Sequence, residues 1–288
     1  MWKQRVATGL ELTTRSSVGR RTLRQATKRG YGPPNALTFM HIEPQFTVSV
    51  GKDLGTFRYQ GTDADAVARH LFWTGLTRWE LESWREFIPL AMTARCFVDV
   101  GAFTGCYSLV AATVNPSLTA LAFEPVPSVY SCLARNLQLN GLEQRAAAVP
   151  AAVSDEVGTA RFFIPDRPMP DTGFLESSAR QSLEAGTWHE VRTTTLAAVL
   201  PGGCRIDLMK IDVEDAEGPV VASMADVLDE HRPTIFIEFL SSGTYVQAFK
   251  VLEALGYQLF HLTDRGRVPV AAPVPDDVFF NFLCVPRS

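Results

Sequence analysis

The chain lacks both a long apolar run and any closely paired cysteines. Its 288 residues contain no stretch of the roughly 20 apolar residues that a membrane-spanning helix needs, and no basic start plus apolar block resembles a secretory signal. The five cysteines are scattered and never spaced as Cys-x-x-Cys, which argues against a disulfide framework and a structural zinc site. We therefore expect a soluble, cytoplasmic protein with no transmembrane segment.

The chain also lacks the glycine fingerprint of dinucleotide-binding folds. That fingerprint, Gly-x-Gly-x-x-Gly, seats a pyrophosphate on a helix N-terminus. Here Gly101 and Gly105 are separated by three residues, and Phe103 stands where a middle glycine would admit the pyrophosphate. Asp99 would add a negative charge beside the phosphates. An NAD-dependent oxidoreductase is therefore the weaker alternative.

What the chain has instead is an apolar run that ends in an acid and two glycines and then opens into a helical pattern. Residues 96–100 are typical of a buried strand, Gly101 and Gly105 permit close backbone approach, and a helical pattern continues from Ser108. Such a turn forms a nucleotide-shaped pocket. S-adenosylmethionine carries an amino group and a sulfonium but no phosphate, so the carboxylate of Asp99 suits it electrostatically.

A second acid follows the next predicted strand. Glu124 comes directly after the apolar residues 118–123, at a distance of 23 residues from Gly101. A carboxylate there can accept both hydroxyls of a ribose, and each charge-assisted bond is worth roughly 1.5 to 3 kcal/mol. Both adenosine cofactors are held in this way, so the glycine spacing is what favours S-adenosylmethionine over NAD.

From Cys96 onward strands alternate with helices, which predicts an α/β fold with a doubly wound, mostly parallel, seven-stranded sheet. The last strand is expected to be antiparallel. Ligands bind beyond the carboxyl ends of such strands, so we expect the acids there to share one rim: Asp99, Glu124, Asp155, Asp212 and Glu238. The predicted strands are 96–100, 118–123, 147–153, 206–211, 233–239, 257–262 and 278–285.

The N-terminal third differs from the rest in charge and pattern. Residues 1–34 carry eight Lys and Arg against one Glu, although the whole chain has a net charge of −4. We predict a partly ordered basic leader at 1–34, an N-terminal cap of a hairpin plus helices at 35–94, and the sheet domain at 95–288. An insertion at 162–191, rich in Pro, Ser, Thr and Gly, is expected to be a mobile lid or substrate loop.

The leader offers little to a nucleic acid, because it contains few aromatic residues for stacking. No nucleic-acid partner is therefore expected. Exchange of the basic leader between two copies with acidic bodies would give a homodimer, and this alternative stays open.

Four motifs between about Glu80 and Glu238 resemble the FkbM family of class I methyltransferases, whose fold is Rossmann-like. The resemblance implies methyl transfer from S-adenosylmethionine to a small-molecule acceptor, most simply a hydroxyl of a natural product, sugar or polyketide. The chain departs from the family at Phe103 and Asp215, where Asn and Gly are usual. The motifs are Val98-Asp-Val-Gly-Ala-Phe-Thr-Gly-Cys-Tyr-Ser108, Ala122-Phe-Glu-Pro-Val-Pro127, Asn136-Leu-Gln-Leu-Asn140 and Leu208-Met-Lys-Ile-Asp-Val-Glu214.

The resemblance and the rim position together predict the site. Lys210, Asp212 and Glu214 end the fourth strand and are the catalytic candidates: Asp212 or Glu214 would remove the proton of the acceptor, with Lys210 anchoring charge nearby. Glu80 matches an acid that the family usually carries. The predicted cofactor contacts are Asp99, Gly101, Ala102, Phe103, Gly105, Glu124, Asp155 and Glu80.

Three alternatives remain open at this point. Asp212 and Glu238 end adjacent strands and could share a Mg²⁺ that lowers the pKa of the acceptor hydroxyl and orients it. The methylated atom could be nitrogen rather than oxygen. The departures at Phe103 and Asp215 also leave room for a non-catalytic module that keeps the cofactor-binding fold without turnover.

Overall fold

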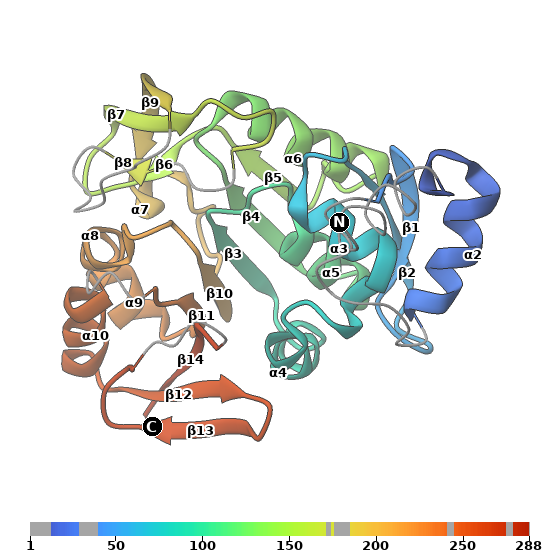
Figure 1. Cartoon of the computed structure of the whole chain (residues 1–288). Helices are drawn as coiled ribbons and strands as arrows, with labels where there is room; N and C mark the ends of the chain where they lie inside the picture. The colour runs from blue at the N-terminus through green and yellow to red at the C-terminus, as the bar shows by residue number, and fades with distance from the viewer. Residues whose placement is uncertain are drawn as a thin grey trace.

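The computed structural model describes residues 13–28, 40–170, 174–175, 185–240, 245–274 and 279–287. Over these residues the central element is an eight-stranded sheet of order β5-β4-β3-β10-β11-β14-β12-β13 (Figure 1). Neighbours from β5 to β11 are parallel, and β14 lies antiparallel between β11 and β12. The strands are β3 Cys96–Val100, β4 Thr119–Phe123, β5 Ala146–Val149, β10 Leu208–Ile211, β11 Thr234–Glu238, β12 Tyr257–Thr263, β13 Gly266–Val270 and β14 Asn281–Pro286.

The predicted doubly wound α/β fold is confirmed, with its antiparallel last strand inserted near the edge. β13 is an eighth strand that the sequence did not predict. Its burial pattern is exposed almost throughout, so it has no alternation of apolar residues to detect. It pairs along the outer edge of β12. Within the described residues, no helix is both long and apolar enough to cross a membrane.

Helices cover both faces of the sheet (Figure 1). The sheet separates the two main hydrophobic cores. One core contains apolar side chains of α4, α5 and α6, and the other contains those of α7 to α10. Strands buried on both faces are typical of parallel sheets, and all five residues of β3 are buried. The helices are α4 Leu81–Ala91, α5 Cys106–Val114, α6 Pro127–Leu139, α7 Leu196–Val199, α8 Glu217–Ser223, α9 Ala225–His231 and α10 Tyr245–Ala254.

Alternation along the strands decides which polar side chains face the same way. In β3, Val98 and Val100 belong to the core under α7 to α10, whereas Phe97 belongs to the core under α4 to α6. Successive side chains of a strand point to opposite faces, so Asp99 lies on the side of Phe97. Leu208 belongs to the same core as Phe97, so Lys210, two residues later, lies on the same face as Asp99. Lys210 is also the partner of Asp99 in the β3–β10 register.

A second sheet stands where the composition predicts a loop. The predicted strand 147–153 is divided by Pro150 into β5 and the short β6, Ala152–Val153, and β6 joins a four-stranded sheet of order β6-β9-β7-β8. The ends of the expected lid at 162–191 are therefore strands, and 171–173 and 176–184 lie outside the described residues. Turn-forming residues between the strands masked their signal. The strands are β7 Gly158–Pro165, β8 Phe174–Leu175 and β9 Gly186–Thr194.

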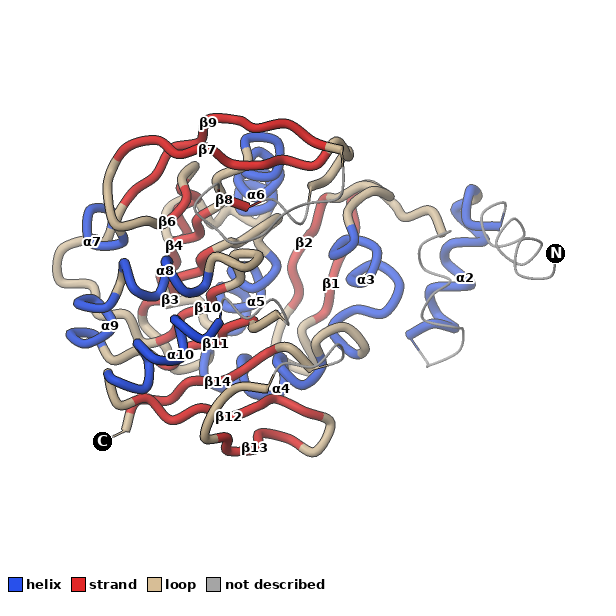
Figure 2. The backbone as a smooth tube through the Cα atoms, turned by 60° about the vertical axis from the view of Figure 1, so that its left-hand side comes forward, coloured by secondary structure: helices blue, strands red, loops and turns tan. Residues whose placement is uncertain are grey.

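The N-terminal part contains the predicted hairpin and helices. Beyond the hairpin lies α2 (Figure 2). Its Arg24 guanidinium donates to the Phe72 and Thr47 carbonyls and lies 4.3 Å from the centre of the Phe72 ring. The division into leader, cap and sheet domain stays a prediction, and residues 1–12 and 29–34 of the leader lie outside the described residues. The elements are α2 Ser17–Lys28, β1 Gln45–Ser49, β2 Thr56–Gln60, α3 Ala66–Thr74 and a 3₁₀ turn, η2 Gly75–Thr77.

Candidate active site

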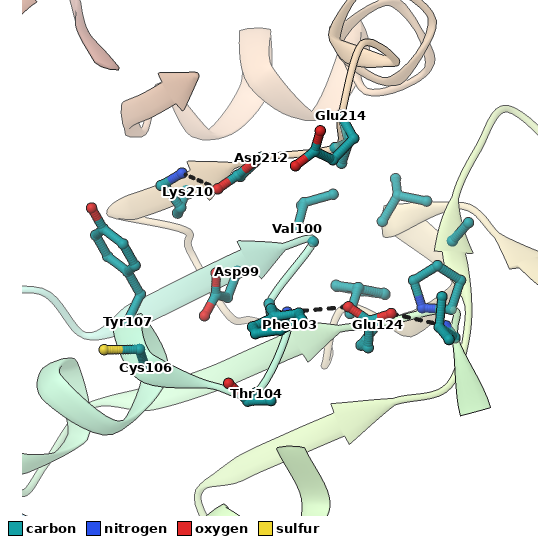
Figure 3. A pocket seen from close by; sticks show the side chains of 18 of the residues that line it. Asp99, Val100, Phe103, Thr104, Cys106, Tyr107, Glu124, Lys210, Asp212 and Glu214 are labelled. Atoms are coloured by element: carbon teal, nitrogen blue, oxygen red, sulfur yellow. Dashed lines mark hydrogen bonds and ion pairs between the residues drawn. The ribbon is translucent and has the colours of Figure 1, made fainter. Parts of the chain in front are cut away.

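A cavity of about 220 Å³ opens at the carboxyl ends of β3, β4 and β10 (Figure 3). Its walls come from the turn after β3, the end of β4, the segment after β10, and parts of the second sheet. The predicted site residues that line it are Glu80, Asp99, Gly101, Ala102, Phe103, Glu124, Lys210, Asp212 and Glu214. The rim position inferred from the sequence thus brings most of these residues to one cavity.

The turn after β3 is forced into its shape by close packing. Gly101 has φ +79°, and a Cβ there would lie 1.7 Å from the carbonyl oxygen of Asp212. Gly105 has φ +90°, and a Cβ there would lie 2.6 Å from Leu133. Both positions therefore require glycine. Phe103, between them, also has a positive φ of 49°, which costs about 1–2 kcal/mol in a residue with a side chain.

Glu124 presents a pre-oriented carboxylate to the cavity. The side chain is 6% exposed, one oxygen accepts the Phe103 backbone N–H at 3.1 Å, and the other accepts the Val126 N–H at 2.8 Å. Burial raises the pKa of Glu124 to about 8, although the two backbone hydrogen bonds act in the opposite direction. Each oxygen keeps a lone pair for a further donor. The group is therefore oriented for a pair of hydroxyls.

Asp99 lies deeper, at the end of β3. Its carboxylate is 2% exposed and accepts a hydrogen bond from the Ser108 hydroxyl at 2.7 Å. Burial raises the pKa of Asp99 to about 6, while the bond from Ser108 and the charge of Lys210 act to lower it. A cationic group entering the cavity would favour the ionised form of this side chain.

Lys210 is a buried cation surrounded by acids. Its Nζ lies 3.0 Å from Asp212 Oδ2 and 5.2 Å from the centre of the Tyr107 ring (Figure 3). Burial acts to lower the pKa of Lys210, but the nearby carboxylates of Asp212, Glu80 and Glu238 together raise it above its ordinary value. Lys210 therefore stays charged, and Asp212 is held by a fixed ion pair.

Glu80 reaches the cavity from outside the sheet. It has a left-handed backbone conformation, φ +48°, immediately before α4, and its carboxylate accepts a hydrogen bond from the Tyr107 hydroxyl. Burial raises the pKa of Glu80, against the lowering effects of Lys210 and of the Tyr107 bond. The sequence predicted an acid near the site from the segment before the sheet, and Glu80 lines the cavity from that segment.

Glu214 and Asp215 begin the turn between β10 and α8. Both have positive φ, +52° and +72°, and Glu214 lines the cavity while Asp215 is buried beside it. Asp215 occupies a conformation that favours glycine, so its departure from the family pattern coincides with a strained backbone position. Phe103 is a second departure from the family pattern at a positive φ. Asn, the usual residue there, tolerates a left-handed conformation better than Phe.

Three predicted site residues do not line the cavity: Gly105, Asp155 and Glu238. Asp155 is exposed just after β6, where it accepts from the Ser154 hydroxyl at 3.0 Å, and its proposed contact to adenine stays a prediction. Glu238 ends β11 and does not line the cavity. Burial, with Asp212 nearby, raises its pKa well above the ordinary value.

A magnesium site is not supported. Among the described residues, no group of three or more His, Cys, Asp and Glu side chains is arranged to hold a metal ion. The charge of Asp212 is compensated by Lys210 at 3.0 Å. Lys210 therefore supplies, beside Asp212, the positive charge that a shared Mg²⁺ would have supplied.

Sequence reasoning missed three polar residues of the site: Thr104, Tyr107 and Ser108. All three lie inside the first motif, so their presence was visible. Their roles could not be predicted, because the directions of these side chains depend on how the turn and α5 are oriented against β3.

Comparisons with known proteins agree with this geometry. The family described as "Methyltransferase FkbM domain" matches residues 99–259. "Methyltransferase sdnD" of Sordaria araneosa is 30% identical over 189 residues, covering 56% of this chain and 73% of the relative. "Methyltransferase 1" of Beauveria bassiana (strain ARSEF 2860) is 26% identical over 176 residues, covering 56% and 71%.

Two further similarities cover a smaller share of the other protein. "31-O-demethyl-FK506 methyltransferase FkbM" of Streptomyces tacrolimicus is 30% identical over 154 residues, which are 44% of this chain and 58% of the relative. A crystal structure of "Methyltransferase FkbM" from Methylobacillus flagellatus KT aligns with a TM-score of 0.44 and 14% identity, over 67% of this chain and 43% of that one.

Proposed function

Because the chain belongs to the FkbM methyltransferase family, we propose that it transfers a methyl group from S-adenosylmethionine to a hydroxyl of a small-molecule acceptor. The observation that carries the proposal is Glu124, a buried carboxylate whose two oxygens are oriented by backbone N–H groups at the mouth of a cavity beside a glycine turn. When bound, the cofactor supplies a methyl group that is already activated by its sulfonium.

The residues of the cavity fit such a cofactor. Glu124 accepts the two ribose hydroxyls with the lone pairs that its backbone partners leave free. Asp99 lies further along the rim and attracts the amino group. Gly101 lets the turn after β3 approach the segment after β10 closely, and both form part of the cavity wall. In a dinucleotide site Asp99 would stand beside phosphates, whereas S-adenosylmethionine has none.

Asp212 is the proposed base. It lines the cavity, its ion pair with Lys210 at 3.0 Å fixes its orientation, and its side chain keeps 30% exposure, so an acceptor hydroxyl can reach it. Removal of the hydroxyl proton by a positioned carboxylate turns the oxygen into a better nucleophile. Glu214, at the same wall, is the alternative base.

The charge of the cavity supports a neutral acceptor. Among the described residues that line it, Glu80, Asp99, Glu124, Asp212 and Glu214 are acids and Lys210 is the cation. A phosphate or carboxylate near the transferred methyl would be repelled by these acids. A hydroxyl of a natural product, sugar or polyketide would not be repelled. One relative is named as a 31-O-demethyl-FK506 methyltransferase. The cytoplasmic location, the absence of a nucleic-acid partner and the homodimer stay predictions.

Calorimetric titration tests the cofactor. We expect S-adenosylmethionine and S-adenosylhomocysteine to bind with micromolar affinity, with or without Mg²⁺, and NAD to give no heat. Binding of NAD alone would overturn the proposal. A non-catalytic module, suggested by the strained Phe103 and Asp215, would bind both sulfur compounds but transfer no methyl group to any acceptor in a panel of sugars and polyketides.

A further inference from the structure

The Asn136-Leu-Gln-Leu-Asn140 motif lies on α6 and meets β2 of the N-terminal hairpin, although its residues do not line the cavity. Asn140 exchanges two hydrogen bonds with the backbone of Arg58: its Oδ1 accepts the N–H at 2.8 Å and its Nδ2 donates to the carbonyl at 2.7 Å. One turn earlier, Asn136 Oδ1 accepts the N–H of Gln60 at 2.7 Å. The two side-chain amides thus bond to one edge of β2 as a neighbouring strand would.

Asn136 does one thing that Asn140 does not. Its Nδ2 donates to the carbonyl of Thr104 at 3.0 Å, inside the glycine turn that lines the cavity. The Thr104 hydroxyl also forms a hydrogen bond with the Tyr59 hydroxyl, from β2. Asn136, Thr104 and Tyr59 are all fully buried. The hairpin, α6 and the turn are therefore joined by buried hydrogen bonds.

This turn needs such support. Gly101, Phe103 and Gly105 have positive φ, so the backbone reverses its handedness three times within five residues. A left-handed conformation at a residue such as Phe103 persists only where surrounding contacts hold it. On one side the Phe103 N–H donates to Glu124. On the other side, Thr104 is held by Asn136 and Tyr59.

We propose that Asn136 and Tyr59 are positioning residues for the cofactor turn, and that the β1–β2 hairpin acts as a brace that keeps the turn in its binding conformation. Neither residue touches the cavity, so they act through Thr104 and Phe103. The inference rests on the proposed function for the identity of the ligand. The effect of Asn136 and Tyr59 on the turn does not depend on any ligand.

The first measurement is hydrogen exchange of the backbone amides at 99–107 in the free protein. We expect faster exchange in Asn136→Ala than in the wild type, and a smaller increase in Tyr59→Phe, which removes only the hydroxyl. The matched control is Asn140→Ala, which loosens the same helix from the same strand without touching Thr104. In that variant we expect exchange at 99–107 to stay as in the wild type.

The second measurement is calorimetric titration with S-adenosylhomocysteine at a temperature well below the unfolding midpoint of each variant. We expect about tenfold weaker binding for Asn136→Ala, roughly threefold for Tyr59→Phe, and less than about twofold for Asn140→Ala. A purely structural role would lower the unfolding midpoint of Asn136→Ala and Asn140→Ala without separating their affinities.

The outcomes are distinct. If the wild type does not bind S-adenosylhomocysteine, the proposed function fails and the exchange data alone decide the brace. If the wild type binds, and Asn136→Ala and Tyr59→Phe match it in exchange and affinity, the brace is wrong. Should Asn136→Ala not fold, an unchanged Tyr59→Phe in both measurements is enough to overturn the inference.

Discussion

At the scale of single residues, the carboxyl groups of the site differ in the neighbours that hold them. Asp212 is paired with a buried lysine, whereas Glu124 has only backbone N–H donors beside it. The first arrangement fixes the orientation of the Asp212 side chain. The second leaves a group that takes up or releases a proton when a ligand arrives, because burial, together with the nearby Asp99 and Asp212, raises the pKa of Glu124.

Replacing Asp212 by Asn should lower kcat by roughly 10²- to 10⁴-fold, because the amide cannot accept the proton of the acceptor hydroxyl. The measurement is transfer of a radiolabelled methyl group to the panel acceptor that the wild type uses. Affinity for S-adenosylhomocysteine serves as the control and should stay nearly unchanged. Full activity would exclude Asp212 as the base, and loss of activity in Glu214→Gln instead would assign the role to Glu214.

Binding of S-adenosylhomocysteine at pH 7 should release a proton from Glu124. The pKa of Glu124 is about 8 in the free protein, and ribose hydroxyls that donate to the carboxylate favour its ionised form, so binding lowers this pKa. Affinity should therefore rise from pH 6 to pH 8 and then level off. Titrations in two buffers of different ionisation enthalpy count the released protons. Glu124→Gln should release none, and a wild type that releases none would contradict the assignment.

At the scale of elements, α2 is attached to the rest of the molecule through specific polar contacts rather than a broad apolar face. Arg24 donates to carbonyls of β1 and α3, and the buried Thr27 hydroxyl lies within hydrogen-bond distance of the Trp73 carbonyl at 2.6 Å. Burial lowers the pKa of Arg24. Part of the basic leader is thus a docked helix, which net charge alone does not indicate.

Arg24→Ala should reduce the free energy of unfolding by about 1–3 kcal/mol, because two carbonyl oxygens lose a charged donor and the Phe72 ring loses its cation. Urea unfolding measures this change. Arg21→Ala on the exposed face of α2 is the matched control and should change stability by less than about 0.5 kcal/mol. Equal effects of the two variants would show that α2 is not held by Arg24.

At the scale of the whole molecule, buried carboxyl groups make stability depend on pH. Burial raises the pKa of Glu217 to about 8, its Oε1 accepts the Asp215 N–H at 3.2 Å, and its other oxygen has no hydrogen-bond partner among the described residues. The folded chain therefore keeps a proton on Glu217 that the unfolded chain loses above about pH 4.5. This stabilisation is complete below pH 4.5 and is lost as pH rises through 8.

The free energy of unfolding should fall between pH 5 and pH 8, by up to about 1.4 kcal/mol per pH unit for each such carboxyl. Glu217→Gln removes one titrating group and should flatten the slope. Exposed Glu156→Gln is the control and should leave the slope as in the wild type. Urea unfolding at pH 5.5, 6.5 and 7.5 measures it. A stability that rises over this range in the wild type would contradict the burial of protonated carboxyls.

Much of the fold and of the site could be predicted locally. The strand 96–100 and the acid within it follow from a short apolar run before two glycines, and Glu124 follows directly from the next run. By contrast, β7 and β9 carry mixed residues with turn-formers between them, and their pairing joins Phe162 to His189 across that segment. A strand whose partner is distant and whose faces are half exposed leaves little local pattern.

By itself, the sequence determined where the parallel strands lie along the chain, the rim at which most of their acids gather and the glycine turn, because short apolar runs and backbone freedom are local properties of the chain. Only the tertiary structure decided that Lys210 neutralises Asp212, that burial raises the pKa of Glu124, and that Asn136 bonds to β2 from 76 residues away. These depend on which distant segments exclude water together, and no local pattern records that.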